Sequence, residues 1–116
     1  MIVAHGNGTR GSDASEAAGI RSVFGAAVPP VTAFKWAFGH LIAASGVLDL
    51  APGLTALRHG VVPGIATLKT PDPAMAGLPI SAAAQKPRSD IALVLSRGFA
   101  AMNVALVVRA SSQNGT

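Results

Sequence analysis

Apolar residues along this chain form short continuous runs that alternate with longer, helix-spaced stripes. The runs lie at residues 1–4, 31–34, 91–95 and 104–108. Runs of this length bounded by turn residues are typical of buried strands, and the last two predict strands that are covered on both faces. Strands of this kind alternating with helices predict a layered α/β fold around a mostly apolar central sheet.

Two segments have the apolar spacing of helices. The spacing predicts a first helix over residues 14–24, with Asp13 at its N-cap and Glu16 three residues later in a capping-box pattern. It predicts a second helix over residues 40–58, which contains Pro52. Because an interior proline removes one backbone hydrogen bond and clashes with the preceding turn, we expect a kink or a break there.

The remaining segments are turn-rich or polar. Residues 60–79 hold four prolines and three glycines, which predicts a long irregular connection with extended backbone at 65–68. A short strand is expected at 80–84. We expect one domain over residues 1–110 and a mobile polar tail over 111–116.

Composition narrows the possible classes of protein. The chain has 116 residues, of which 50% are hydrophobic and 12% are charged, so it fits one small packed domain better than a disordered chain. It contains no cysteine, which excludes a disulfide scaffold, a thiolate metal site and a cysteine nucleophile within these residues. No uncharged run is long enough to cross a bilayer and no secretory leader is recognisable, so we expect a cytoplasmic protein.

The net charge of +4 favours an anionic partner. The basic residues are scattered and no aromatic residues alternate with them, so we expect no nucleic-acid partner. An acidic protein or a phosphate-bearing ligand fits this modest charge better.

Two histidines stand at positions where chemistry is plausible. His5 directly follows a predicted strand, in a glycine-rich turn, and ligands in α/β sheets bind at the carboxyl ends of strands. His40 stands at the start of the second predicted helix, where a neutral imidazole can donate to a developing oxyanion. Lys35 could tune that site or pair with Glu16. The plainer alternatives are a satisfied histidine in a tight turn, a polar helix terminus and a surface lysine.

Other site classes have less support. A metal site built from His5, His40 and Asp13 lacks the dense ligand spacing of helical metal sites, so we expect no metal. His59 fits a cation at a helix C-terminus. No nucleophile-elbow motif supports a serine triad.

Six segments together resemble the C-terminal half of the β-ketoacyl-acyl-carrier-protein synthases. They are His5-Gly6-Asn7-Gly8-Thr9, Asp13 with Glu16, residues 35–41 (Lys-Trp-Ala-Phe-Gly-His-Leu), residues 56–63, Pro71-Asp72-Pro73, and Gly98-Phe99 followed by Asn103. The resemblance implies the thiolase-like fold, in which two similar halves pack as five layers. It also implies that this chain is a partial half, with a mixed sheet and helices on both faces.

The resemblance also implies an activity and a role for each matching residue. The family condenses an acyl chain with malonyl-acyl-carrier protein and releases CO2, in fatty-acid or polyketide biosynthesis. His5, His40 and Lys35 match its catalytic set, supported by Asp13 and by Glu16 as the carboxylate partner of Lys35. Thr9 and Asn7 match residues that contact phosphopantetheine, and Phe99 matches a gating residue beside the acyl pocket. No cofactor is implied beyond the phosphopantetheine that carries the substrates.

The chain departs from the family pattern at several positions. Asn7 replaces a threonine, Ala100-Ala101 replace two glycines, and Arg97 stands where a small polar residue is usual. The family's nucleophilic cysteine lies in its N-terminal half, so we expect this chain alone to be inactive. These departures favour a secondary-metabolism branch, such as an aryl polyene or resorcinol pathway.

The implied partners are acyl carrier protein and the cysteine-bearing half, in a homodimer or in a heterodimer with a synthase-like subunit. Two other functions stay open. One is a non-catalytic, chain-length-factor-like partner of an active synthase. The other is a binding module for phosphopantetheine or carrier protein.

Overall fold

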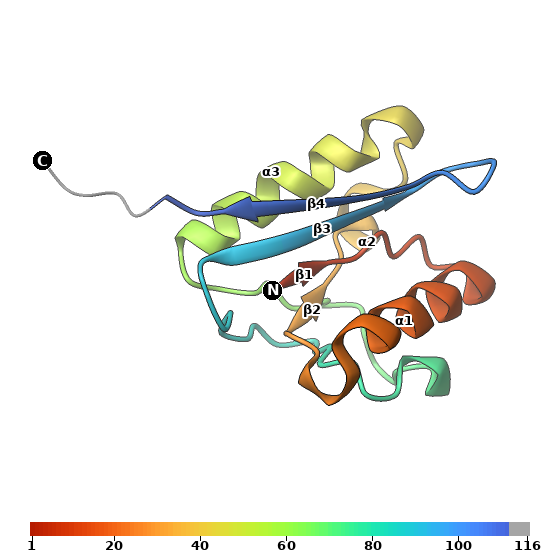
Figure 1. The fold of residues 1–116 in the computed structure, drawn as a ribbon, viewed down its shortest axis with the longest axis horizontal. Helices are drawn as coiled ribbons and strands as arrows, with labels where there is room; N and C mark the ends of the chain where they lie inside the picture. The colour runs from red at the N-terminus through yellow and green to blue at the C-terminus, as the bar shows by residue number, and fades with distance from the viewer. Residues whose placement is uncertain (112–116) are drawn as a thin grey trace, which may run out of the picture.

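A computed structural model describes residues 1–111 as one α/β layer structure (Figure 1). Its strands and helices, in chain order, are β1 (Ile2–Val3), α1 (Arg10–Phe24), β2 (Val31–Thr32), α2 (Lys35–Phe38), α3 (Ser45–Arg58), β3 (Ile91–Arg97) and β4 (Asn103–Arg109). Single 3-10 turns lie at Gly25–Ala27, Ile42–Ala44 and Pro73–Met75. Of the tail expected at 111–116, all but Ser111 lies outside the described residues.

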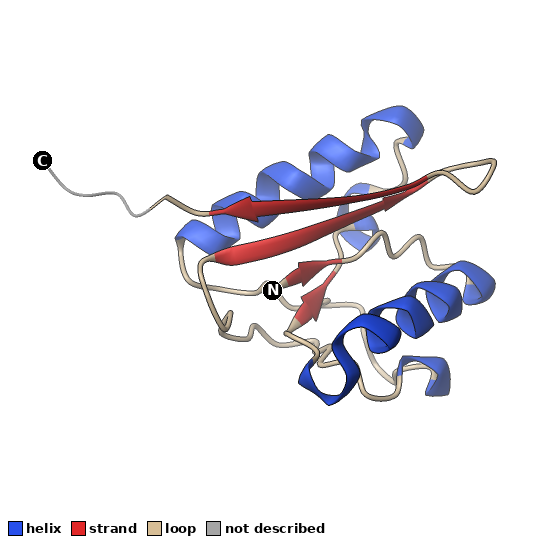
Figure 2. Ribbon diagram, in the orientation of Figure 1, coloured by secondary structure: helices blue, strands red, loops and turns tan. Residues whose placement is uncertain are grey.

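The strands form one mixed sheet in the order β2-β1-β3-β4 (Figure 2). β1 is parallel to both neighbours, with Ile2 opposite Val31 on one side and Leu93 on the other. β3 and β4 form an antiparallel hairpin that pairs Ile91 with Arg109. The carboxyl ends of β1, β2 and β3 therefore meet at one edge of the sheet.

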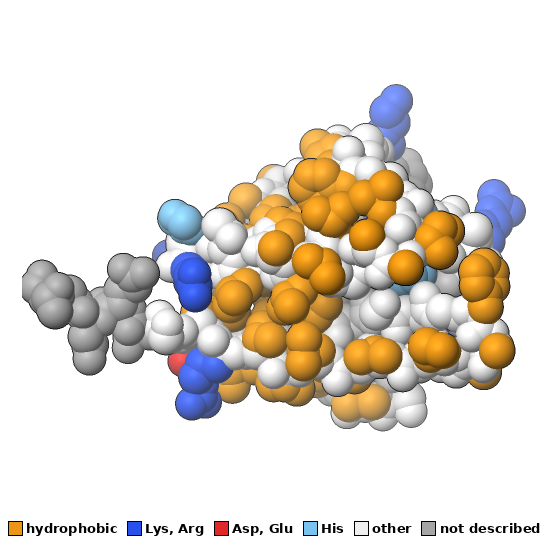
Figure 3. Space-filling view, turned by 90° about the horizontal axis from the view of Figure 1, so that it is seen from above, with side chains coloured by type: hydrophobic (Ala, Val, Ile, Leu, Met, Phe, Trp, Pro, Cys, Tyr) orange, Lys and Arg blue, Asp and Glu red, His pale blue; other side chains and the backbone are white. Residues whose placement is uncertain are grey.

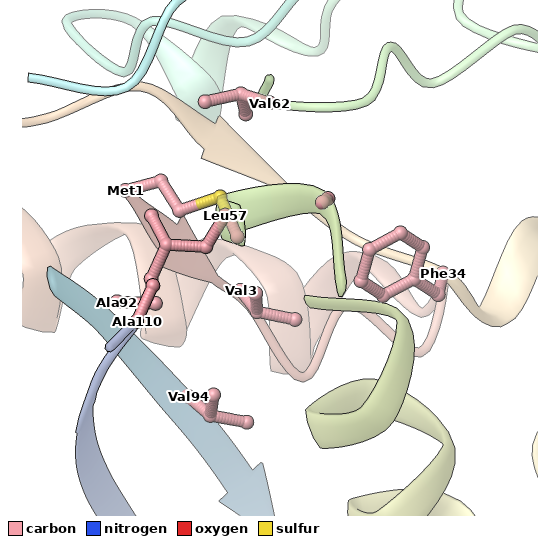
Figure 4. Packing of buried hydrophobic residues seen from close by; sticks show 9 residues of the cluster. Met1, Val3, Phe34, Leu57, Val62, Ala92, Val94 and Ala110 are labelled. Atoms are coloured by element: carbon pink, nitrogen blue, oxygen red, sulfur yellow. The ribbon is translucent and has the colours of Figure 1, made fainter. Parts of the chain in front are cut away.

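Helices cover both faces of the sheet, and alternate residues of each strand supply the two cores. Val3 and Val94 pack with Phe34 and Leu57 on the α3 face (Figure 4). Ile2 faces the other way and packs with residues of α1 and of the segment before β2. The expected partial α/β half, with a mixed sheet between helices, is thus confirmed.

The last strand departs from the expectation of cover on both faces. β3 is buried at Ala92 and Val94, but β4 is exposed at most positions, including Leu106 at 43% and Val107 at 67%. Hydrophobic side chains therefore gather on the face over α3 and β4 (Figure 3). The apolar run predicted the strand correctly, but among the described residues nothing packs over most of it.

The first helix begins earlier than its apolar stripe predicts. It begins at Arg10 with Thr9 as N-cap, and the Thr9 side chain makes no capping hydrogen bond. Asp13 lies inside the helix, so the predicted capping box is wrong. Glu16 points instead to the turn after β1, which offers its carboxylate two backbone N–H groups.

The second predicted helix is divided. Residues 40–44 form a turn and a 3-10 segment, and α3 begins only at Ser45. It then runs unbroken through Pro52 to Arg58, so the predicted break does not occur. The buried face of α3 carries Ser45, Asp49, Gly53, Ala56 and Leu57. Val47 lies on the outer side of α3 and is 65% exposed.

The connection from α3 to β3 is irregular, as predicted, but its details differ. Leu68 donates a backbone hydrogen bond to Ile65, so residues 65–68 form a turn rather than extended chain. No strand forms at 80–84, and the nearest pairing is an isolated bridge between Val62 and Gln85. Among the helices of residues 1–111, none is long and apolar enough to cross a membrane.

Gly53 sets how closely α3 approaches the sheet. A Cβ atom at Gly53 would lie 2.9 Å from Cγ2 of Val3, which is fully buried in β1. We expect Gly53→Val to lower the free energy of unfolding by about 1–3 kcal/mol through overpacking. Urea denaturation of the chain and the variant measures this change.

The matched control is Gly19→Val in α1, where an added Cβ meets nothing within 4 Å. That variant should stay within about 0.5 kcal/mol of the parent chain. Equal losses at both positions would show that valine in a helix, and not contact with β1, causes the effect.

Candidate active site

The sheet edge where three strands end brings the candidate residues together. His5 follows β1, Lys35 follows β2 and Arg97 ends β3, so all three belong to the same edge. His40 reaches this edge from the turn after α2. The ring centroids of His5 and His40 are 5.3 Å apart, with an interplanar angle of 78°. The two histidines that the sequence singled out therefore form one pair.

Glu16 fixes the turn that carries His5. Its Oε1 accepts the backbone N–H of His5 at 2.7 Å, and its Oε2 accepts that of Gly6 at 3.0 Å. Gly6 has φ +45°, and a Cβ there would lie 2.7 Å from Cβ of Ala33, so glycine is required on both counts. This carboxylate therefore shapes the backbone of the site.

The hydrogen bonds of both imidazoles define their tautomer. The backbone N–H of Arg97 donates to Nδ1 of His5 at 3.3 Å, and that of Ile42 donates to Nδ1 of His40 at 3.1 Å. A neutral imidazole whose Nδ1 accepts a hydrogen bond carries its proton on Nε2. Both rings therefore offer Nε2–H as a donor.

His40 is held by the start of α3 rather than at its own helix terminus. Its Nδ1 lies 3.0 Å from Oγ of Ser45, which also accepts the backbone N–H of Leu41 at 2.8 Å. The expected position at a helix start is thus wrong by one turn. His5 is 2% exposed, whereas His40 lies on the exposed side of the described chain.

Lys35 pairs with Asp49 and not with Glu16, which corrects the sequence-based expectation. Lys35 Nζ donates to Asp49 Oδ2 at 2.5 Å, and the two side chains are only 5% and 2% exposed. Glu16 is unavailable because both of its oxygens bind the His5–Gly6 turn. Asp49 is the site residue that sequence reasoning missed, although it is the only acidic residue in the second predicted helix.

Burial and nearby charge keep His5 neutral. Burial, followed by electrostatic interaction with Lys35, His40 and Arg97, lowers the pKa of His5 to about 4. Burial raises the pKa of Glu16 and of Asp49, and Lys35 partly offsets the shift at Asp49. The site therefore favours an uncharged imidazole at neutral pH.

The glycine-rich turn after His5 arranges the other polar candidates. Asn7 Oδ1 accepts both the N–H and the hydroxyl of Thr9, at 3.0 and 2.9 Å. The amide nitrogen of Asn7 and the oxygen of Thr9 stay open for a ligand. Asp13 lies one helical turn on, where burial raises its pKa and its Oδ1 has no hydrogen-bond partner.

Phe99 lies in the β3–β4 turn and is 85% exposed. Met102 N–H donates to the Phe99 carbonyl, and both central residues, Ala100 and Ala101, have positive φ of 54° and 58°. Positive φ at both positions favours glycine or asparagine, so the two alanines place backbone strain in this turn.

No metal centre forms in residues 1–111, where no three potential ligands cluster. A cavity of about 320 Å³ lies between α1 and the irregular connection, and its mainly apolar lining, which includes Ile20, Trp36 and Met75, reaches Gly6 and Glu16 at the His5 turn. His5 and His40 are not among its lining residues. The imidazole pair is thus the centre with the clearest chemistry.

Removing the charge of the buried Asp49 should lower the free energy of unfolding more than removing that of the exposed Asp90. Asp49→Asn leaves the Lys35 cation buried without a counter-charge, and we expect a loss of about 3–5 kcal/mol in unfolding free energy. Asp90→Asn removes the exposed Arg109–Asp90 pair at 3.4 Å and should cost less than about 1 kcal/mol. Urea denaturation at pH 7 compares them, and similar losses would contradict a structural role for the buried pair.

The depressed pKa of His5 predicts a pH-dependent contribution to stability. Between about pH 4 and the ordinary histidine value near 6.5 the unfolded state binds a proton at this position and the folded state does not, so this contribution rises with pH. The stability advantage of the chain over its His5→Gln variant should therefore grow from pH 4 to 6.5 and stay constant above. The buried carboxyls have raised pKa values, so their contribution to stability falls as pH rises. Subtracting the stability-versus-pH curve of the variant from that of the parent chain cancels this effect, because both proteins share it. A flat difference would contradict the shift.

Comparison with known proteins agrees with this geometry. Residues 1–69 match the family model of the β-ketoacyl synthase C-terminal domain. The actinorhodin polyketide putative β-ketoacyl synthase 1 of Streptomyces coelicolor is 38% identical over 98% of this chain and 25% of its own length. The tetracenomycin polyketide synthase ketoacyl synthase β subunit of Streptomyces glaucescens is 38% identical over 94% of this chain and 27% of its own.

A solved structure, the ishigamide ketosynthase/chain length factor, superposes with a TM-score of 0.86 at 31% identity, and covers 96% of this chain and 28% of that one. The chain thus has the thiolase-like architecture of ketosynthases and spans about a quarter of the length of the curated relatives it matches. On the family model, the relatives and the shared fold, this chain belongs to the β-ketoacyl synthases, of which it carries the C-terminal domain.

Proposed function

We propose that this chain supplies the hydrogen-bonding half of a ketosynthase active site for decarboxylative Claisen condensation. In this reaction malonyl-acyl-carrier protein loses CO2, and the resulting enolate carbon attacks an acyl thioester on a cysteine. The new C–C bond forms as the C–S bond breaks, and the cysteine leaves as thiolate. The chain contains no cysteine, so that nucleophile comes from outside these 116 residues.

The observation that carries the proposal is the pair of imidazoles that both accept a backbone N–H at Nδ1. Both can then direct an Nε2–H to one thioester oxygen, where negative charge develops as CO2 leaves. Donors fixed before the reaction stabilise such charge without the cost of reorganisation. A charged His5 would bind a carboxylate instead of the thioester oxygen. Its low pKa keeps the ring neutral at neutral pH and so prevents this.

The buried Lys35–Asp49 pair supports the site without being one of its hydrogen-bond donors. The positive charge of the ammonium group adds to the effect of burial in keeping the His5 ring neutral, and Asp49 of α3, the helix that also carries Ser45, holds this ammonium group. The pair thus acts as a positioning element. The open groups of Asn7 and Thr9 fit the amides of a phosphopantetheine arm, which would deliver the malonyl group from acyl carrier protein.

The test is reconstitution with a cysteine-bearing N-terminal ketosynthase portion, assayed as CO2 release from malonyl-acyl-carrier protein and as condensed product. We expect no condensation by the chain alone, condensation by the assembly, and a loss of about 10²–10³-fold when His5→Ala or His40→Ala removes one donor. The control is His59→Ala, because His59 lies at the far end of α3 from Ser45 and its side chain bonds the Thr55 carbonyl of the same helix. Condensation by the chain alone would contradict the proposal.

A chain-length-factor-like role is the second candidate. It is favoured by the similarity to the ishigamide ketosynthase/chain length factor and by the exposed apolar face over α3 and β4, which suits a synthase-like partner. Under this role His5→Ala and His40→Ala variants would still activate a cysteine-bearing subunit, and product length would change. Retention of the paired donors favours the catalytic role.

A further inference from the structure

Arg97 joins more elements of the site than any other side chain described above. It ends β3, and its backbone N–H donates to Nδ1 of His5. Its guanidinium donates to the Ser12 carbonyl at 2.7 Å, to Ser15 Oγ at 3.2 Å and, through Nε, to Asn103 Oδ1 at 3.2 Å. One residue thus connects β3, β4 and the first turns of α1 with an imidazole.

These contacts connect the two elements that hold His5, namely α1 and the end of β3. Ser12 and Ser15 lie on α1 beside Glu16, which binds the backbone N–H of His5. The Arg97 side chain therefore fixes the helix that holds the His5 backbone, while the Arg97 backbone holds the His5 ring. If the guanidinium were removed, the end of β3 would lose its side-chain hydrogen bonds to Ser12 and Ser15 at the start of α1, and the long 3.3 Å bond to Nδ1 of His5 would be the first to weaken.

We propose that the Arg97 side chain is a positioning residue that keeps β3 and α1 at the separation where His5 presents Nε2–H to the substrate. The inference rests on the proposed function of His5 as a donor. It also requires arginine in particular, since the fork spans acceptors on two elements, whereas the single ammonium of lysine cannot reach all three with the same geometry.

The test reads the His5 tautomer directly, by long-range ¹H–¹⁵N NMR of the full chain at pH 7. We expect a single Nε2–H tautomer in the parent chain. Arg97→Met should give a mixture of both tautomers, and Arg97→Lys, which keeps the charge, should give a similar mixture. The control is Arg58→Met on the exposed end of α3, which removes the same charge and should leave the tautomer unchanged.

In the reconstituted enzyme we expect Arg97→Met to lower kcat for CO2 release about tenfold with little change in KM, a part of the loss seen when a donor is removed altogether. Should Arg97→Met fail to fold, the double variant Ser15→Ala/Asn103→Ala removes two guanidinium partners at exposed positions and should shift the tautomer in the same direction.

An unchanged Nε2–H tautomer in Arg97→Met, or in the double variant if the first does not fold, overturns the proposal. Rescue of the tautomer by Arg97→Lys would show that charge and not the fork is responsible, and would also overturn it. These NMR readouts do not depend on activity. A failure of the proposed function would appear instead as full activity in His5→Ala, whatever the NMR result for Arg97.

Discussion

The buried ion pair between Lys35 and Asp49 determines how α3 meets the sheet. A lysine at the end of β2 cannot stay charged in the core without a counter-charge, so the facing helix must offer a carboxylate, and it does so on a stripe of small residues. Gly53, one turn beyond Asp49, allows α3 to approach Val3 closely. Ser45, one turn before, then meets His40. One electrostatic requirement thus explains why small and polar residues of α3 face the sheet and how the second imidazole is held.

The same pair sets the electrostatics of the site. Burial of His5, together with the nearby Lys35 cation, makes a positive charge on the imidazole unfavourable, so the ring stays neutral and acts as a donor. Glu16 could have neutralised that cation, but its oxygens bind two backbone N–H groups instead. Asp49 thus neutralises the lysine and Glu16 binds the backbone of the His5 turn. Because each carboxylate has its own partner, neutral hydrogen-bond donors can lie near a charged lysine.

The sequence predicted the four strands and the two long helices in the right order, because continuous apolar runs and helix-spaced stripes report burial directly. It also predicted a strand at 80–84 that does not form, and it did not predict the short helix α2. The residue pattern also placed His5 correctly after a strand, whereas the pairing of His5 with His40 in one site was implied only by the resemblance to the synthases. It failed where the outcome depends on which partner a side chain meets. Asp13 and Glu16 have the spacing of a capping box, yet the turn after β1 needs the Glu16 carboxylate more than the helix end does. Asp49 looks like an exposed helix residue until the burial of Lys35 is known.

The exposure of β4 and of the outer face of α3 bears on the chemistry as well as on packing. A hydrogen bond to a developing oxyanion is strongest where water is excluded, and His5 already lies in such surroundings. His40 does not, because among residues 1–111 nothing covers its side of the site. The exposed apolar side chains Leu41, Ile42 and Phe38 surround that same side. A protein surface that buries these side chains would also exclude water from His40. The same contact would therefore cover the exposed apolar surface and strengthen the hydrogen bond that His40 can donate.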